Sequence, residues 1–88
     1  MLNDGGYGAE SHKFRPYGVN PNHAIHGRGD FAAVACGFGL NCVKVATPGR
    51  FEGLFRELQV VGGATLWDVD IDDLIPSRQY RRVHYGEA

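Results

Sequence analysis

The sequence lacks both a strong charge bias and any long apolar run. Acidic and basic side chains nearly balance, which gives a formal net charge of -1 over 88 residues. This balance offers no electrostatic case for binding nucleic acid or an anionic membrane. No apolar stretch approaches the roughly 20 residues that span a bilayer, and the first residues lack the basic and apolar regions of a signal peptide. We therefore expect a cytoplasmic protein with neither nucleic acid nor membrane as a partner.

Cysteine is also scarce, since Cys36 and Cys42 are the only two. Two cysteines do not make a disulfide framework, and their spacing is not that of a Cys-x-x-Cys pair. We expect both thiols to stay reduced, one on a helix face and one in a strand.

Glycine, by contrast, is abundant: thirteen glycines indicate many tight turns. The short length limits the chain to one small domain with a marginal core.

Patterns typical of strands and helices alternate along most of the chain. We expect a strand stub that ends at Asn3, followed by a glycine-rich loop over 3–29 with one short helical turn near 10–14. A helix at 31–38, a strand at 41–46, a second helix at 48–61 and a second strand at 64–71 come next. The chain then continues as a polar tail over 74–88. Strands that alternate with helices predict βαβ units and a parallel sheet. The fold class is therefore α/β, with a partial parallel-sheet (βαβ) domain.

The segment after the strand stub is the strongest candidate for a site. Ligands of parallel α/β sheets bind beyond the carboxyl ends of the strands, where Asn3 and Asp4 are expected. Their oxygens suit a hard cation such as Mg²⁺, and the glycines that follow allow a ligand to approach the backbone closely. A loop as long as 3–29 is uncommon in a compact domain unless it has a function. From spacing alone, an ordinary Asn-Asp-Gly-Gly β-turn is the favoured interpretation of this segment.

The run Leu2-Asn3-Asp4-Gly5-Gly6-Tyr7-Gly8-Ala9-Glu10 resembles the closing half of the thiamine-diphosphate motif. That motif opens with Gly-Asp-Gly and closes in Asn-Asn or Asn-Asp. The segments Gly29-Asp30-Phe31-Ala32-Ala33-Val34-Ala35 and Thr65-Leu66-Trp67-Asp68-Val69 are similar to the end of the same domain. The chain thus resembles, over residues 1–82, the carboxyl-terminal half of the diphosphate-binding domain of acetolactate synthases and 2-oxo acid decarboxylases. Residues 83–88 are expected to be a polar tail.

The resemblance implies a cofactor, a metal and roles for named residues. The cofactors would be thiamine diphosphate and Mg²⁺, in an enzyme that makes or breaks a carbon–carbon bond next to a carbonyl. Asp4 would bind the metal through its side chain and Gly6 through its backbone carbonyl. Cofactor binding would involve Asn3, Gly5, Tyr7 and Gly8. Glu10 would act as the acid/base catalyst.

Two parts of the family's apparatus are missing from these 88 residues. The Gly-Asp-Gly segment, whose aspartate would be another metal ligand, is absent. So is the pyrimidine-binding domain, whose glutamate activates the cofactor. We therefore expect the isolated chain to be inactive and to need the missing N-terminal portion or a partner subunit. The complete enzyme would be a homo-oligomer. The alternative hypothesis is a non-catalytic α/β interaction module that has lost cofactor binding.

Structural roles are favoured for the other conspicuous side chains. The list comprises the loop histidines His23 and His26, the helix N-cap Asp30, the core or interface residue Trp67, the solvent-facing strand carboxylates Asp68 and Asp70, and the solvated arginines Arg78, Arg81 and Arg82.

Overall fold

The computed structural model describes all residues from Met1 to Ala88. The chain divides into two compact units, which we describe separately. The sheet unit consists of Met1–Asn3 and Gly29–Ile71, and the helical unit consists of Asp4–Arg28 and Asp72–Ala88. No helix has the length and apolar character needed to cross a membrane.

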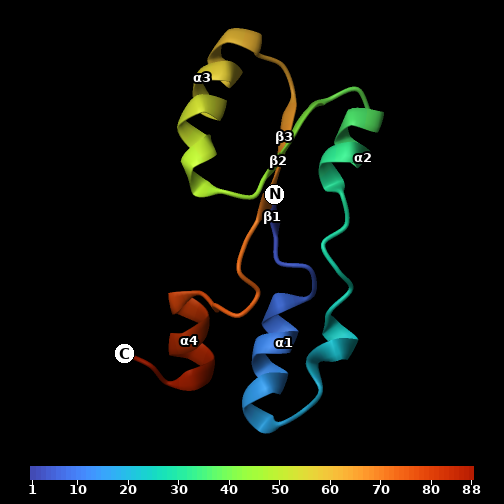
Figure 1. The fold of residues 1–88 in the computed structure, drawn as a ribbon. Helices are drawn as coiled ribbons and strands as arrows, with labels where there is room; N and C mark the ends of the chain where they lie inside the picture. The colour runs from blue at the N-terminus through green and yellow to red at the C-terminus, as the bar shows by residue number, and fades with distance from the viewer. The chain divides into compact units, whose positions relative to one another are not determined.

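The sheet unit contains a small parallel sheet with two helices (Figure 1). Its strands are β1 (Leu2–Asn3), β2 (Asn41–Val45) and β3 (Thr65–Asp70), and its helices are α2 (Phe31–Gly37) and α3 (Phe51–Val61). The strand order is β1-β3-β2, and β1 and β2 both pair with β3 in parallel. The expected α/β class and parallel sheet are confirmed at this level.

The two helices cover opposite faces of the sheet (Figure 1). Alternate residues of a strand point to opposite faces. On one face of β3, Trp67 contacts Phe51 and Phe55 of α3, with ring centroids 6.1 and 5.0 Å apart. On the other face, Asp68 is bonded to Phe31 at the start of α2. The sheet therefore has a helix on each side, as is usual for parallel strands.

Local sequence signals explain where these two helices begin and end. The Asp30 carboxylate accepts a hydrogen bond from the Ala33 N–H at 3.0 Å, so the expected N-cap of α2 is confirmed. Pro48 opens a short 3-10 turn, η3 (Pro48–Arg50), that leads into α3. Gly62, with a φ of +65°, follows the last residue of α3 and ends the helix.

The carboxylate of Asp68 is fully buried, with 0% of the residue exposed. One of its oxygens accepts a hydrogen bond from the Asn3 side-chain amide at 3.0 Å. The other accepts from the Phe31 N–H at 3.1 Å. The expectation that Asp68 faces solvent is therefore wrong. An alternating strand pattern indicates a solvated face only where the sheet has one, and here α2 covers that face.

The helical unit has more regular structure than the sequence predicted. It contains α1 (Gly8–Phe14), the 3-10 helices η1 (Arg15–Tyr17) and η2 (Pro21–Ala24), and α4 (Arg78–Tyr85). The segment 3–29 is thus not a loop with a single helical turn. The polar segment 74–88, in which the sequence indicated no helix, contains α4 over 78–85.

Capping and tertiary contacts account for α4. The Ser77 hydroxyl accepts a hydrogen bond from the Tyr80 N–H at 3.1 Å at the start of the helix. The Tyr80 hydroxyl donates to the Ala9 carbonyl at 2.7 Å, and the Tyr85 hydroxyl donates to the carbonyl of His12. Two tyrosines therefore hold the arginine-rich helix to α1, an anchorage that hydropathy alone does not indicate.

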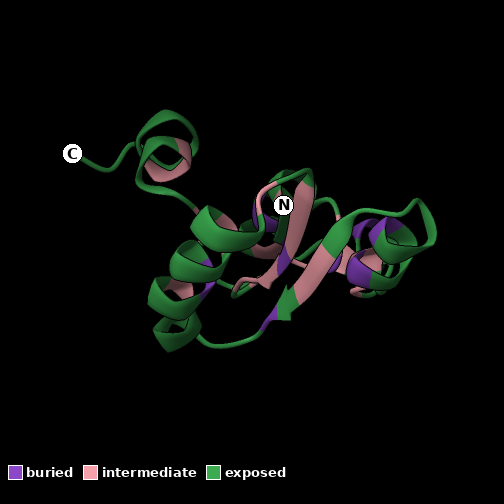
Figure 2. Cartoon of the chain, turned by 90° about the horizontal axis from the view of Figure 1, so that it is seen from above, coloured by how far each residue is buried: buried purple, intermediate pink, exposed green.

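Few apolar residues are buried, and most residues of the chain are exposed (Figure 2). The buried apolar residues are Ala32, Ala35, Val45 and Leu54 in the sheet unit and Ala24 in the helical unit. Several large apolar side chains are exposed instead, among them Phe38 and Val60 at 82% and 85%. Exposed apolar surface on this scale favours association with another surface.

We predict that Asp68→Ala lowers the free energy of unfolding by about 3 kcal/mol, because it leaves the Phe31 N–H and the Asn3 amide without an acceptor in a buried site. Asn3→Ala removes one of the two bonds and should cost less, and the two substitutions should be less than additive together. Urea unfolding followed by Trp67 fluorescence measures both. Glu52→Ala is the control, since its exposed pair with Arg56 contributes only a few tenths of a kcal/mol. Equal losses for Asp68 and Glu52 would refute the assignment.

We also predict that the isolated chain self-associates. Leu2 lies on the unpaired edge of β1 and is 71% exposed, and α3 exposes Phe55, Val60 and Val61. Light scattering should give a mass above that of one chain, and Val60→Lys should reduce it, while Gln59→Lys on the same helix serves as the control. A monodisperse monomer for the unmodified chain would contradict this prediction.

Candidate functional site

The candidate site is the turn that begins at Asp4, directly after the carboxyl end of β1. The Asp4 carboxylate folds back over this turn, and one oxygen accepts a hydrogen bond from the Gly6 N–H at 3.3 Å. Its other oxygen lies against the backbone of Gly8, in the space that a Cβ at that position would occupy. Asp4 is still only half-buried, so the carboxylate remains accessible from solvent.

The glycine turn is held by a segment about twenty residues further along the chain. The Tyr7 N–H donates to the Ala24 carbonyl at 2.7 Å, and Gly6 forms an antiparallel bridge with Ile25. The Gly5 carbonyl accepts from the N–H groups of His26 and Gly27, at 3.1 and 2.8 Å. These bonds give the turn a defined shape. Sequence analysis missed them, because no local pattern links residues so far apart.

Glycine is required at two positions of the turn for different reasons. Gly5 has a φ of +80°, a conformation that other residues adopt only with strain. Gly6 has no room for a side chain, because a Cβ there would overlap the Ala24 carbonyl and lie 3.1 Å from the Ile25 Cα. The glycine-rich composition therefore follows from the close approach of two backbone segments.

Helix α1 starts immediately after the turn and carries Glu10 in its first turn. The Tyr7 carbonyl accepts hydrogen bonds from the N–H groups of Glu10 and Ser11, at 3.0 and 3.1 Å. Glu10 is exposed and lies close enough to Tyr80 to affect its titration. Desolvation raises the pKa of Tyr80, and the charges of Tyr85 and Glu10 raise it further.

The oxygens at the turn fit part of a magnesium site. Asp4 offers a carboxylate, and no backbone N–H is bonded to the carbonyl of Gly6. Mg²⁺ in phosphate sites usually takes one or two protein oxygens together with phosphate oxygens and water. Nowhere in the chain do three or more His, Cys, Asp or Glu side chains converge, so these residues supply only a share of the ligands.

The other expected cofactor residues have different surroundings. Asn3 is buried in the sheet unit, where its amide is bonded to Asp68. Tyr7 is exposed and packs edge-on against the ring of His26, with centroids 5.5 Å apart. Gly8 is the first residue of α1.

Three acidic residues at and after the end of β3 (Asp70, Asp72 and Asp73) have local partners rather than a shared site. In the helical unit, the Asp72 carboxylate accepts from the Leu74 N–H at 2.8 Å, and Asp73 lies 3.8 Å from the guanidinium of Arg15. In the sheet unit, Asp70 lies 4.0 Å from the ammonium of Lys44. These three carboxylates therefore take part in turn and surface interactions.

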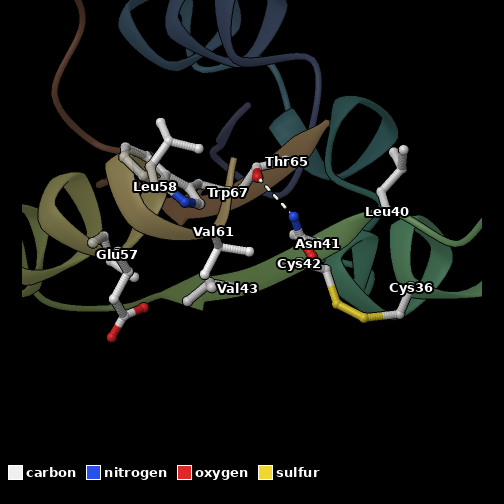
Figure 3. A pocket seen from close by; sticks show the side chains of 11 residues that line it. Cys36, Leu40, Asn41, Cys42, Val43, Glu57, Leu58, Val61, Thr65 and Trp67 are labelled. Carbon is white, nitrogen blue, oxygen red and sulfur yellow. Dashed lines mark hydrogen bonds between the residues drawn. A yellow bond between two sulfur atoms is a disulfide. The ribbon is translucent and has the colours of Figure 1, made fainter. Parts of the chain in front are cut away.

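Sequence analysis also missed a cavity of about 390 Å³ in the sheet unit (Figure 3). It lies between α3 and the α2–β2 connection, and Trp67 forms part of its wall. The other lining residues are Cys36, Leu40, Asn41, Cys42, Val43, Leu54, Glu57, Leu58, Val61 and Thr65. In the sequence, the apolar residues of α3 and the single tryptophan were the only features that pointed to this cavity.

A disulfide joins Cys36 and Cys42 at the wall of this cavity (Figure 3). The expectation of two reduced thiols therefore does not describe this structure. Sequence spacing gave no reason to pair the two residues. The tight connection between α2 and β2 brings their Cα atoms to 5.6 Å, which is within bridging distance.

Comparison with protein-family models, with curated proteins and with solved structures found no match to this chain.

We predict that Gly6→Ala lowers the free energy of unfolding by about 2 kcal/mol, because the new methyl group meets the backbone at residues 24 and 25 and the turn must open. Gly8→Ala should cost less than 1 kcal/mol by comparison, since its methyl group meets only the end of the Asp4 side chain, which can rotate away, and alanine favours the helix. Hydrogen exchange at the Tyr7 amide reports directly on the turn. Equal loss of protection in both variants would contradict this account.

Proposed function

We propose that this chain is the carboxyl-terminal part of the diphosphate-binding domain of a thiamine-diphosphate enzyme similar to acetolactate synthase or a 2-oxo acid decarboxylase. In the complete protein it would hold Mg²⁺ and the cofactor's diphosphate. The reaction class is the making or breaking of a carbon–carbon bond next to a carbonyl. Alone, the chain would be inactive.

One observation carries this proposal: an accessible carboxylate lies over a glycine turn directly after a parallel strand. Asp4 is the first residue beyond β1, and ligands of parallel α/β sheets bind at this end of the strands. The carboxylate is bonded to the Gly6 N–H and packs on Gly8, so the turn keeps it next to the glycine backbone. Fold alone would not identify a cofactor, so the residue pattern at 3–10 supplies the specificity of the proposal.

The residues present would bind and orient the cofactor. Asp4 would ligate Mg²⁺ through its carboxylate and Gly6 through its carbonyl, and the metal would neutralise the diphosphate. Gly5 and Gly8 would let the phosphate oxygens approach the backbone, beside Tyr7. Thiamine diphosphate, when bound, supplies stabilisation of the carbanion.

Glu10 is the proposed acid/base group. It is exposed in the first turn of α1, one turn beyond the metal-binding segment, so a proton can be exchanged there with solvent. Asn3 would act indirectly, since its amide is bonded to Asp68 rather than directed to a ligand.

The rest of the site would come from an upstream portion of the domain or from a partner subunit. The missing parts are a further metal ligand, the aspartate of Gly-Asp-Gly, and the activating glutamate. The unpaired edge of β1 is a natural place for an upstream strand to add, because β1 pairs with β3 on only one side and exposes Leu2. Homo-oligomerisation of the complete enzyme belongs to the same proposal.

A second candidate function is a non-catalytic interaction module. The exposed apolar side chains favour it, in particular Phe38 and those along α3. In that case Asp4 would serve only to shape its turn, through the bond to the Gly6 N–H.

Titration of thiamine diphosphate at fixed Mg²⁺ separates the two functions. The full chain is combined with an upstream fragment that carries Gly-Asp-Gly, and complex formation is verified first. We predict that Asp4→Ala weakens cofactor binding by about 100-fold, because the metal loses a side-chain ligand. Asp4→Asn should keep most of the affinity, since its carbonyl oxygen still reaches the metal.

Asp30→Ala is the matched control, because it removes a carboxylate that caps α2 and lies outside the turn. It should leave the affinity unchanged. A complex that binds cofactor equally well with Asp4→Ala would exclude Asp4 as a ligand. A stable complex that binds no cofactor at all would favour the interaction module.

A further inference from the structure

We propose that Cys36 and Cys42 form a reversible redox site, which a small thiol–disulfide couple of the glutathione class opens and closes. The site belongs to the sheet unit and is independent of the proposed cofactor site. It controls one wall of the cavity that Trp67 lines.

The fold places the two cysteines within bonding distance of each other. Cys36 lies in the last turn of α2, and Cys42 lies in β2, where it pairs with Leu66 on the face that α2 covers. Their Cα atoms are 5.6 Å apart, close to the commonest separation in disulfides. The geometry therefore favours an intramolecular bond over pairing with another chain.

Hydrogen bonds that do not involve sulfur keep this arrangement. The Gly39 N–H donates to the Cys36 carbonyl at 2.9 Å, and the Leu40 N–H donates to the Ala35 carbonyl at 3.1 Å. Gly39 has a φ of +83°, which lets the chain turn sharply from α2 into β2. The two thiols should therefore remain neighbours after reduction and close again when an oxidant is present.

Accessibility determines where exchange starts. Cys36 is exposed, whereas Cys42 is half-buried in its strand. A glutathione thiolate attacks the Cys36 sulfur, the disulfide bond breaks, and the Cys42 thiolate leaves. A second glutathione attacks the glutathione sulfur of the mixed disulfide, which releases Cys36 and oxidised glutathione. Two electrons and two protons pass to the protein, and oxidation reverses the sequence.

The small ring argues against a purely structural bond. Only six positions separate the two cysteines, and the chain-entropy gain from a cross-link grows with the length of the loop it closes. Because the turn is already fixed by its own hydrogen bonds, the cross-link adds little to the fold. Its main effect is on the cavity wall, which Cys36, Leu40 and Cys42 line together with residues of α3 (Figure 3).

The composition of the chain makes the test direct, since it has two cysteines and one tryptophan. The full chain is equilibrated with glutathione buffers from both the oxidised and the reduced side, quenched, alkylated with N-ethylmaleimide and weighed by mass spectrometry. We expect a single transition from no label to two labels, 9% to 91% complete over about a hundred-fold change in the squared glutathione to oxidised-glutathione ratio. Trp67 emission should change with the same midpoint.

The double variant Cys36→Ser/Cys42→Ser is the control, and its Trp67 emission should not respond to the buffers. Three results would overturn the proposal. The first is a chain that carries two N-ethylmaleimide labels in every glutathione buffer. The second is a chain that takes up no label until it is unfolded, and the third is a non-reducing gel that shows chains cross-linked to one another.

Discussion

The buried carboxylate of Asp68 is the interaction on which the sheet unit depends. A charge in an apolar interior is costly unless hydrogen bonds satisfy it, and Asp68 accepts two, from Asn3 and from Phe31. These partners lie 65 and 37 positions away along the chain. One side chain therefore fixes β1, the central strand and the start of α2 in a single arrangement. Strand β1 has only two residues and few ladder bonds of its own, so this anchorage sets its register against β3.

The register of β1 in turn fixes the point at which the chain leaves the sheet. Asn3 is the last residue of the strand, and its buried side-chain amide is bonded to Asp68. Asp4, the next residue, begins the glycine turn. The turn has its own restraint, because Gly5, Gly6 and Tyr7 are bonded to residues 24–27. A metal ligand needs a fixed backbone on both sides to be pre-organised. The sequence Asn-Asp-Gly-Gly meets that need through two sets of contacts.

Local signals predicted most of the sheet unit, and long-range contacts explain what they missed. Asp30, Pro48 and Gly62 act within a few residues, so helices were expected at 31–38 and 48–61. The structure has them at 31–37 and 51–61, because residues 48–50 form the 3-10 turn η3 before α3 begins. Asp68 was misjudged because the alternation rule presumes a solvated face. Helix α4 was missed because two tyrosine hydroxyls anchor a segment that hydropathy describes as polar. Gly6 and Ile25 form a bridge between separate segments, and so does the disulfide. The spacing of residues in the sequence does not predict such pairs.

A small parallel sheet covered by helices is common to proteins of many functions, so the sheet alone identifies no reaction. The chemistry must come from side chains at the ends of its strands. Here Asp4 is the only carboxylate that directly follows β1 and also contacts the glycine backbone. The acidic residues at and after the end of β3 take part in turns and ion pairs of their own. The proposed metal role is therefore confined to Asp4 and Gly6. The cysteine pair lies within the sheet unit, at the start of β2 beside Asn41, and includes none of the proposed ligand residues.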